Sequence, residues 1–161
     1  MTAYDAGSPV QPNTDAVCRM RCSDADWAIA VDLYVGGQPA CEMEEPRIFA
    51  QRRMTARRGQ QEAGLGGWFG AFVEGQLLCR LGLFTDGSGF GRFQDVQTLL
   101  SARRRVLAST LVHHAGRAGA RDLGIRDLVM VADPDHSATR IYRSLGFTEA
   151  AFQIQLARPR S

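Results

Sequence analysis

The sequence predicts an α+β fold in three layers, in which helices flank a mixed, mostly antiparallel central sheet. Two apolar segments, 68–73 and 76–84, meet at Glu74-Gly75 and have the pattern of a β-hairpin. Near Ser101 the apolar period changes from that of a strand to that of a helix. Residues 128–132 form a continuous apolar run, as expected of a strand that is buried on both faces of a mixed sheet.

The length of 161 residues suits a single domain with a substantial core. Residues 1–15 have no apolar period and are rich in small residues, Ser, Pro, Gln and Asn, so we expect an N-terminal arm. A neighbouring subunit is one candidate for ordering this arm, which allows for a homodimer. Residues 16–161 are expected to form the domain.

The first half of the domain is expected to contain a strand, two helices and the hairpin. Residues 16–22 alternate as a strand does, and Ser23-Asp24 can cap a helix that stops at Gly36-Gly37. A second helix is expected from about Glu44 to Arg58, before the glycines of 64–67 break the chain.

The second half is expected to alternate strands and helices. The expected elements are a fourth strand at 90–99, a helix from about 101 to 124, a fifth strand at 128–132, a helix at 135–146 and a last strand through 152–156. The longer helix has one apolar stripe, formed by Leu107, Leu111, Ala115 and Ala118. The shorter helix has Asp135 as a candidate N-cap and Gly146 as a C-terminal stop.

Charge and hydropathy argue against two classes of partner. A net charge of +2 is small for a dedicated nucleic-acid-binding domain, and no apolar run approaches the ~20 residues that span a bilayer. The N-terminus lacks the basic and apolar regions of a signal peptide, so a cytoplasmic location is expected. The cysteines are expected to be core thiols, and no metal is expected, because Cys18-x-x-x-Cys22 has no second Cys pair or nearby His to complete a zinc site.

Two segments in the second half of the chain carry the candidate functional residues. The first is Val96-Gln97-Thr98 followed by Arg103-Arg104-Arg105-Val106-Leu107-Ala108, a strand and then an arginine-rich turn at a helix N-terminus. The second is Asp135-x-x-Ala138-x-x-x-Tyr142-x-x-x-Gly146-Phe147. In this order they resemble the GNAT superfamily of acyl-CoA-dependent N-acyltransferases, which has Gln/Arg-x-x-Gly-x-Gly/Ala after a strand and then Asn-x-x-Ala-x-x-x-Tyr-x-x-x-Gly-Phe. The resemblance implies that the fourth and fifth strands are parallel and splayed.

The resemblance also implies an N-acetyltransferase that moves an acetyl group from acetyl-CoA directly to a primary amine of a small molecule or peptide. The exposed backbone of the fourth strand would pair with the pantetheine amides. The helix N-terminus suits the pyrophosphate, because its N–H groups are unpaired, and the arginines add charge. The expected cofactor-binding residues are Val96, Gln97, Thr98, Arg103, Arg104, Arg105, Val106, Leu107, Ala108, Ser109, Asp135, Ala138 and Tyr142.

Val106 stands where the family has a glycine. Its β-branched side chain can crowd a ligand that approaches the backbone, although valine can adopt helical angles and keeps its N–H. Weakened or displaced CoA binding is therefore expected, and Val106→Gly should tighten it. The glycine is also expected to lower the melting temperature slightly, because it is a poor helix former.

Two residues are candidates for proton transfer. Tyr142 matches the family's tyrosine near the CoA sulfur and would protonate the leaving thiolate, which an ordinary tyrosine pKa of about 10 allows. Asp95 is the carboxylate nearest the splay and the candidate general base. By strict alternation Asp95 faces away from Val96, unless a bulge re-aims it. The alternatives are a packing tyrosine and a surface aspartate.

Two other functions are compatible with the sequence. A catalytically degenerate CoA-binding or regulatory module would explain Val106 and the unclear base. A nucleic-acid-binding protein would use the arginines of 52–58 and 103–105, although the balanced charge argues against it. The run 52–58, which can also contact an anionic substrate, is otherwise expected to be a solvated helix face.

Overall fold

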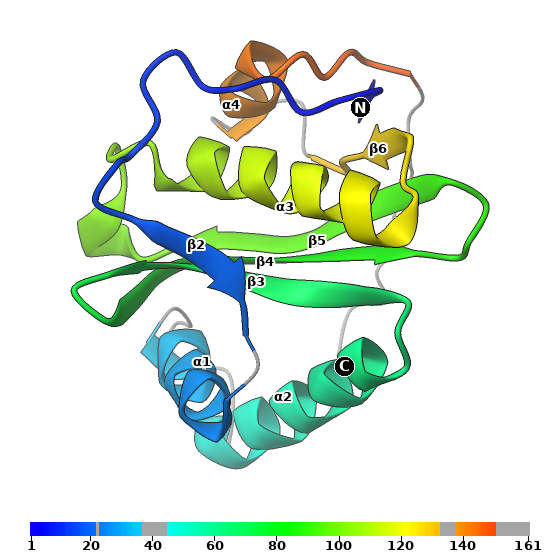
Figure 1. Ribbon diagram of the computed structural model, residues 1–161. Coiled ribbons are helices and arrows are strands. Elements are labelled where there is room, and N and C mark those ends of the chain that lie inside the picture. The colour runs from blue at the N-terminus through cyan, green and yellow to red at the C-terminus, as the bar shows by residue number, and fades with distance from the viewer. Residues whose placement is uncertain (22, 37–44, 133–137, 151–161) are drawn as a thin grey trace, which may run out of the picture.

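The computed structural model describes residues 1–21, 23–36, 45–132 and 138–150. Its element order follows the chain through six strands, one short 3-10 turn and four helices in the described part. These are β1 (Thr2–Ala3), β2 (Val17–Met20), α1 (Asp24–Gly36), α2 (Pro46–Glu62), β3 (Gly66–Val73), β4 (Gln76–Thr85), β5 (Phe90–Thr98), η1 (Leu100–Ala102), α3 (Leu107–Leu123), β6 (Asp127–Val129) and α4 (Ala138–Ser144), shown in Figure 1.

The six strands form one mixed sheet in the order β1-β6-β5-β4-β3-β2. Every neighbouring pair is antiparallel except β5 and β6, which are parallel. The register between these two runs only from Phe90 opposite Asp127 to Arg92 opposite Val129. Because β5 continues to Thr98, its second half is paired on one side only among the described residues. The predicted α+β class and the parallel pair that diverges are therefore confirmed.

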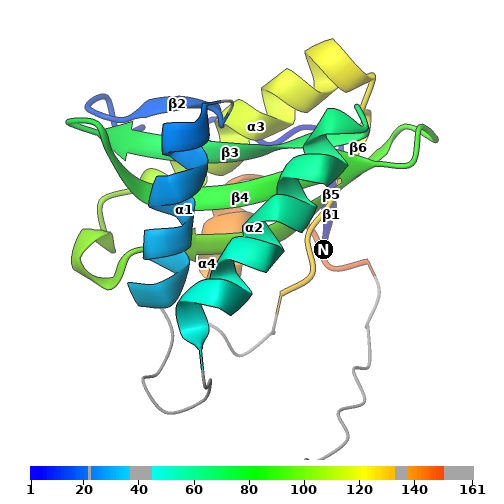
Figure 2. The same cartoon turned by 90° about the horizontal axis from the view of Figure 1, so that it is seen from below.

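The sheet lies between two layers of helices. α1 and α2 cover one face, and α3 and α4 cover the other (Figures 1 and 2). On the α3 side, Leu81, Leu83 and Leu111 are completely buried in the larger core cluster. On the α1–α2 side, Trp68 is buried in a second cluster and donates its indole N–H to the backbone oxygen of Arg57 at 3.0 Å. That bond satisfies the polar edge of a ring whose remaining surface packs in the core.

The N-terminal segment adds a strand to the sheet. β1 pairs with β6, and the Met1 ammonium donates to the backbone oxygen of Met130 at 2.8 Å. Farther along, the Gly7 N–H donates to the Leu145 oxygen at 2.9 Å. The expected arm is thus ordered by its own chain, and these contacts require no neighbouring subunit.

The helix expected from about 101 begins later, at Leu107. A 3-10 turn occupies Leu100–Ala102, and positive φ angles at Arg104 and Val106 interrupt any helix before Leu107. At the other end, Gly124 adopts φ 64°, and the N–H of the next residue, Ile125, donates to the Gly119 oxygen at 3.2 Å, which is a common kind of helix stop. The fifth predicted strand is shorter than expected, and the predicted strand at 152–156 lies outside the described residues.

The described residues contain no helix of sufficient length and apolar character to span a membrane. They also contain no group of three His, Cys, Asp or Glu side chains close enough together to hold a metal ion.

Candidate functional site

A pocket of about 480 Å³ opens between the second half of β5, the N-terminus of α3 and the helix α4. Its lining residues are Val96, Thr98, Ala102, Arg103, Arg104, Arg105, Val106, Leu107, Ala108, Ser109, Ala138, Ile141, Tyr142 and Ser144. This set contains all the predicted cofactor-binding residues except Gln97 and Asp135. The side chain of Gln97 bonds to Arg80, whereas Asp135 lies outside the described residues. The two sequence segments therefore converge on one pocket.

The first wall of the pocket is the second half of β5, which is not paired with β6. Val96 and Thr98 point into the pocket, and the Thr98 hydroxyl lies 3.1 Å from the sulfur of buried Cys79. Beyond Arg92, the β5 edge that faces away from β4 has no strand partner among the described residues. Such an edge can pair with an extended ligand that carries amide groups, as one more strand would.

The second wall is the turn that starts α3. The first helical hydrogen bond of this turn runs from the Thr110 N–H to the Val106 oxygen at 3.1 Å. The N–H groups of Leu107, Ala108 and Ser109 precede that bond and have no carbonyl partner within the helix. Together with the exposed side chains of Arg103–Arg105, they form the positive end of the pocket. This combination suits a phosphate or pyrophosphate group.

Val106 adopts the left-handed conformation, with φ 60° and ψ 10°. Val106 therefore does not take the helical angles that valine can adopt. Left-handed backbone is the conformation that glycine adopts readily and that a β-branched residue avoids. Val106 thus has a backbone conformation that favours glycine, and it places a valine side chain, 43% exposed, on the pocket wall. This shape also reverses the expected effect of glycine on stability.

Tyr142 forms part of the third wall, on α4. The residue is 5% exposed, and its ring meets Phe147 edge-on with 6.2 Å between centroids. Burial raises the pKa of the Tyr142 hydroxyl to about 12. The hydroxyl therefore keeps its proton at neutral pH and can serve as a donor inside the pocket.

Asp95 lies at a bulge in β5. Its φ is 48°, and the register between β4 and β5 shifts between Arg80 and Gly82. The carboxylate nevertheless faces α2, where its Oδ2 accepts from Nη2 of Arg53 at 3.2 Å and from Nη2 of Arg57. Asp95 and the pocket residue Val96 thus occupy opposite faces of the sheet, as strict alternation indicates. Both residues lie in the part of β5 that is not paired with β6.

The sequence interpretation missed how deeply some arginines are buried. Arg57 belongs to the run 52–58, which was expected to be solvated, yet it is only 5% exposed. Arg21 and Arg80 are 0% and 2% exposed. A signal was present for Arg57, because Ala50, Met54 and Arg57 follow at helical spacing and all three are buried on one face of α2.

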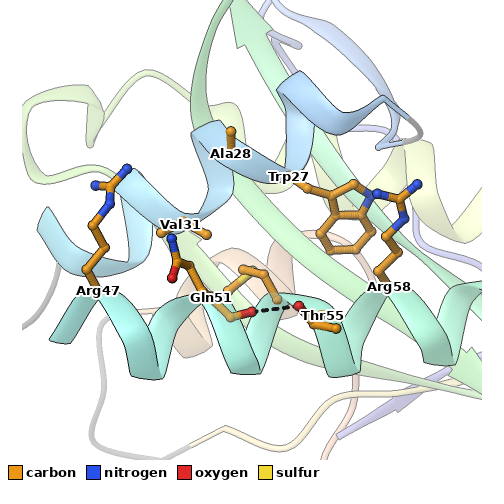
Figure 3. Close-up of a pocket in the computed structure, with 8 residues that line it drawn as sticks. Trp27, Ala28, Val31, Arg47, Gln51, Thr55 and Arg58 are labelled. Carbon is orange, nitrogen blue, oxygen red and sulfur yellow. Dashed lines mark hydrogen bonds between the residues drawn. The ribbon is translucent and has the colours of Figure 1, made fainter. Parts of the chain in front are cut away.

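A second pocket, of about 220 Å³, lies between α1 and α2 (Figure 3). Trp27 and Val31 form part of its wall, and Arg47 and Arg58 lie at its two ends. Both arginines are already paired with carboxylates. Arg47 contacts Asp32 at 2.8 Å, and Arg58 contacts Asp24 at 2.5 Å and Glu62 at 3.0 Å. This pocket therefore has less unneutralised positive charge to offer a ligand than the turn that starts α3.

Solved structures share this fold over most of the chain. One is AAC(6')-Iy in complex with the bisubstrate analogue CoA-S-monomethyl-acetylneamine, with a TM-score of 0.66, 17% identity, and coverage of 91% of this chain and 99% of that chain. Another is a GCN5-related N-acetyltransferase from Kribbella flavida, with a TM-score of 0.62, 21% identity, and coverage of 90% and 51%. A transcriptional regulator from Bacillus halodurans gives a TM-score of 0.67 at 17% identity, with coverage of 89% and 99%.

No protein-family model matches the sequence, and a search of curated proteins finds no match. At these identities the structural likeness defines the fold, which is that of the GCN5-related N-acetyltransferases, abbreviated GNAT. The two motifs in the second half of the chain predicted the same fold. Because a transcriptional regulator shares it, the function has to be argued from the site.

Proposed function

We propose that this protein is an N-acetyltransferase that moves an acetyl group from acetyl-CoA to a primary amine by direct transfer. The observation that carries the proposal is the pocket of about 480 Å³ in which an open strand edge, a helix N-terminus with three arginines and a buried tyrosine face the same space. Each of the three matches one part of the donor. The AAC(6')-Iy neighbour was solved with an analogue that contains CoA, which is consistent with a CoA-based donor.

The donor would lie along the pocket from the turn to α4. The pyrophosphate would accept hydrogen bonds from the α3 N-terminus and from Arg103–Arg105. The pantetheine amides would pair with the backbone of 96–98, where β5 lacks β6. Ala138 is small and lies on the α4 wall, which leaves room for the pantetheine arm. The thioester would then reach Tyr142.

The chemistry requires two proton transfers. The amine nitrogen, once neutral, attacks the thioester carbonyl and forms the new C–N bond, and the C–S bond then breaks. Tyr142 would give its hydroxyl proton to the departing CoA thiolate. A base takes the proton that the nitrogen loses, so the products are an amide and CoA thiol. No metal and no covalent enzyme intermediate is needed.

Asp95 is the proposed base, acting directly or through water. Both of its contacts with arginine fall on Oδ2, so among the described contacts Oδ1 is left to accept a further hydrogen bond. Asp95 lies on the α2 face of β5, opposite Val96 and Thr98. An amine that entered from the α1–α2 side would meet Asp95 first and the thioester at the gap between β5 and β6.

Calorimetry with CoA tests the donor site. The double variant Arg104→Ala, Arg105→Ala should bind CoA at least about 10-fold more weakly, because each charge-assisted hydrogen bond contributes roughly 1.5–3 kcal/mol. Arg117→Ala is the matched control, since Arg117 is exposed on α3 and does not line this pocket. Equal affinity of the double variant and the parent for CoA would contradict the proposal that CoA binds in this pocket.

A CoA-binding module without catalysis is the second candidate. Two observations favour it: Val106 occupies the wall of the pocket, and Asp95 is paired with two arginines. Mass spectrometry of acetylated products from a panel of amines separates the two candidates. Binding of acetyl-CoA without any acyl transfer would favour the module.

A further inference from the structure

Four arginines gather in the layer between the sheet and the helices α1 and α2. We call Arg21, Arg53, Arg57 and Arg80 the arginine cluster. They surround two aromatic rings: the guanidinium carbons of Arg57 and Arg21 lie 4.4 Å and 5.6 Å from the centre of the Trp68 ring. Those of Arg80 and Arg53 lie 5.3 Å and 5.6 Å from the centre of the Tyr34 ring. Cation–π contacts hold the side chains in place but do not supply a negative charge.

The described carboxylates neutralise this cluster only in part. Asp95 pairs with Arg53 and Arg57, so one negative charge serves two positive ones. Asp26, the carboxylate near Arg21, gives both oxygens to Arg19 at 2.6 Å. In Arg80, Nε and Nη2 donate to the neutral oxygen of Gln97. Among the described residues, Nη1 of Arg80 and all three nitrogens of the Arg21 side chain have no acceptor.

Burial makes this excess charge costly. It lowers the pKa of Arg57 and of Arg21 to about 9 and the pKa of Arg80 to about 10, and neighbouring arginines add to the decrease. The groups therefore remain charged at neutral pH. A buried charge without a counter-charge is strongly unfavourable, and the planar guanidinium fork matches the oxygens of a carboxylate or a phosphate.

The arginine cluster and the proposed donor pocket share one strand. Val96 and Thr98 of β5 line the pocket on the α3 side, while Asp95 and Gln97 contact arginines on the α2 side. β5 loses its partner β6 after Arg92, so the sheet is open between these two faces. Arg53 and Asp95 have side chains that are 41% and 38% exposed and mark the outer end of the cluster, with Arg57 and Arg80 behind them.

We propose that the acceptor amine also carries an anionic oxygen group, a carboxylate or a phosphate, which binds Arg57 and Arg80 of the cluster. This inference rests on the proposed acetyl transfer and names the class of its substrate. The anion supplies the missing negative charge, and the amine of the same molecule then points to the gap beside β5. When the anion takes over Arg57, Asp95 loses one of its two cations and becomes a better proton acceptor.

A titration with sodium phosphate tests the anion site without any acyl transfer. Melting curves are recorded at constant ionic strength for Arg80→Gln and for the control Arg117→Gln. Each is compared with its parent in the Arg104→Ala, Arg105→Ala background, so that the donor-pocket arginines do not contribute. At a phosphate concentration about 100-fold above the Kd, the melting temperature of the parent should be roughly 5–10 °C higher than without phosphate. Arg117→Gln should show the same rise. Arg80→Gln should lose most of that rise. If Arg80→Gln does not fold, Arg80→Lys replaces it, because it keeps the charge but lacks the fork.

Matched pairs of amines test the substrate class and its chemistry. 4-Aminobutanoate is compared with its amide, and phosphoethanolamine with ethanolamine, as acceptors for acetyl-CoA. In one of the pairs, the anionic member should have a kcat/KM at least about 10-fold higher than its neutral twin, in keeping with a charged hydrogen bond. The pair that shows the difference identifies a carboxylate or a phosphate. In Arg80→Gln the ratio should fall toward one, and in Arg117→Gln it should not change.

The two assays separate this inference from the proposed function. Acetyl transfer that prefers neutral amines, or a preference that survives in Arg80→Gln, would overturn the substrate class and leave the transferase intact. If no amine is acetylated, the phosphate titration decides: an Arg80-dependent rise supports the anion site, and a rise equal in Arg80→Gln, or absent from the parent, overturns it.

Discussion

Replacing Val106 by glycine should stabilise the protein. Val106 has φ 60° immediately before α3, where a β-branched side chain is crowded by its own backbone. Glycine adopts that conformation without the crowding. The replacement also removes a side chain from the wall of the proposed donor pocket, so CoA should bind more tightly.

The expected magnitude follows from opposing effects. Left-handed backbone costs an L-residue roughly 1–2 kcal/mol, which glycine avoids. The greater freedom of glycine in the unfolded chain subtracts roughly 0.5–1 kcal/mol. Val106 is 43% exposed, so its lost burial should subtract only a few tenths of a kcal/mol, roughly. The net gain is about 0.5 kcal/mol, a rise in melting temperature of roughly 1–2 °C for a domain of this size.

A comparison of Val106→Gly with Val106→Ala gives a sharper result. At a left-handed position glycine should be more stable than alanine by about 1 kcal/mol, because alanine keeps the crowding Cβ. In the interior of a right-handed helix the order reverses by a similar amount. Arg117, exposed within α3, provides that internal control: Arg117→Ala should be more stable than Arg117→Gly. The free energy of unfolding of all four variants is measured by chemical denaturation. If alanine were more stable than glycine at position 106 as well as at position 117, the left-handed conformation of Val106 would be refuted.

Three further predictions concern Tyr142 and Asp95, the proposed proton-transfer residues. Once an acceptor is known, Tyr142→Phe should keep CoA affinity and lower kcat by about 100-fold, the usual scale for a positioned acid, and a near-parental kcat would leave Tyr142 as a packing residue. Because burial raises the pKa of Tyr142 to about 12, the folded state holds this proton more tightly than the unfolded state. The contribution of Tyr142 to the free energy of unfolding should therefore be constant below about pH 10 and fall between pH 10 and 12. Tyr142→Phe should lack this part of the decline when unfolding is measured at alkaline pH. Asp95→Asn should lower stability by about 1–2 kcal/mol, less than for a fully buried pair because Asp95 is partly exposed, and should lower kcat. A double-mutant cycle with Arg57→Gln that shows no coupling would contradict the pairing.

The sequence predicted which residues come together in the pocket of about 480 Å³, because these residues follow strict spacing rules. Val96 and Thr98 are two apart on a strand, so they point to one face. Ala138 and Tyr142 are four apart on a helix, so they also share a face. Once a parallel pair of strands brings these elements together, the two faces have to meet, and the structure shows that they do.

Other features could not be predicted because they oppose average preferences. Arginine is rarely buried without a partner, so a charge run on a helix is ordinarily assigned to solvent, and Arg57 departs from that rule. Valine avoids positive φ, so nothing in the residue type of Val106 indicates its conformation. The two residues of β1 are too few for any period, and their partners in β6 lie more than 120 positions away in the sequence.

That distance has a consequence for folding. The Met1 ammonium bonds to Met130, Thr2 bonds to Thr148, and the Asn13 side chain donates to the Arg105 oxygen in the turn that starts α3. These bonded partners are 92 to 146 positions apart in the sequence. Contacts of such sequence separation form late, because closing a long loop is entropically unfavourable. The turn before α3 should consequently acquire its final shape among the last steps of folding, and until then the pocket beside this turn should be only partly built.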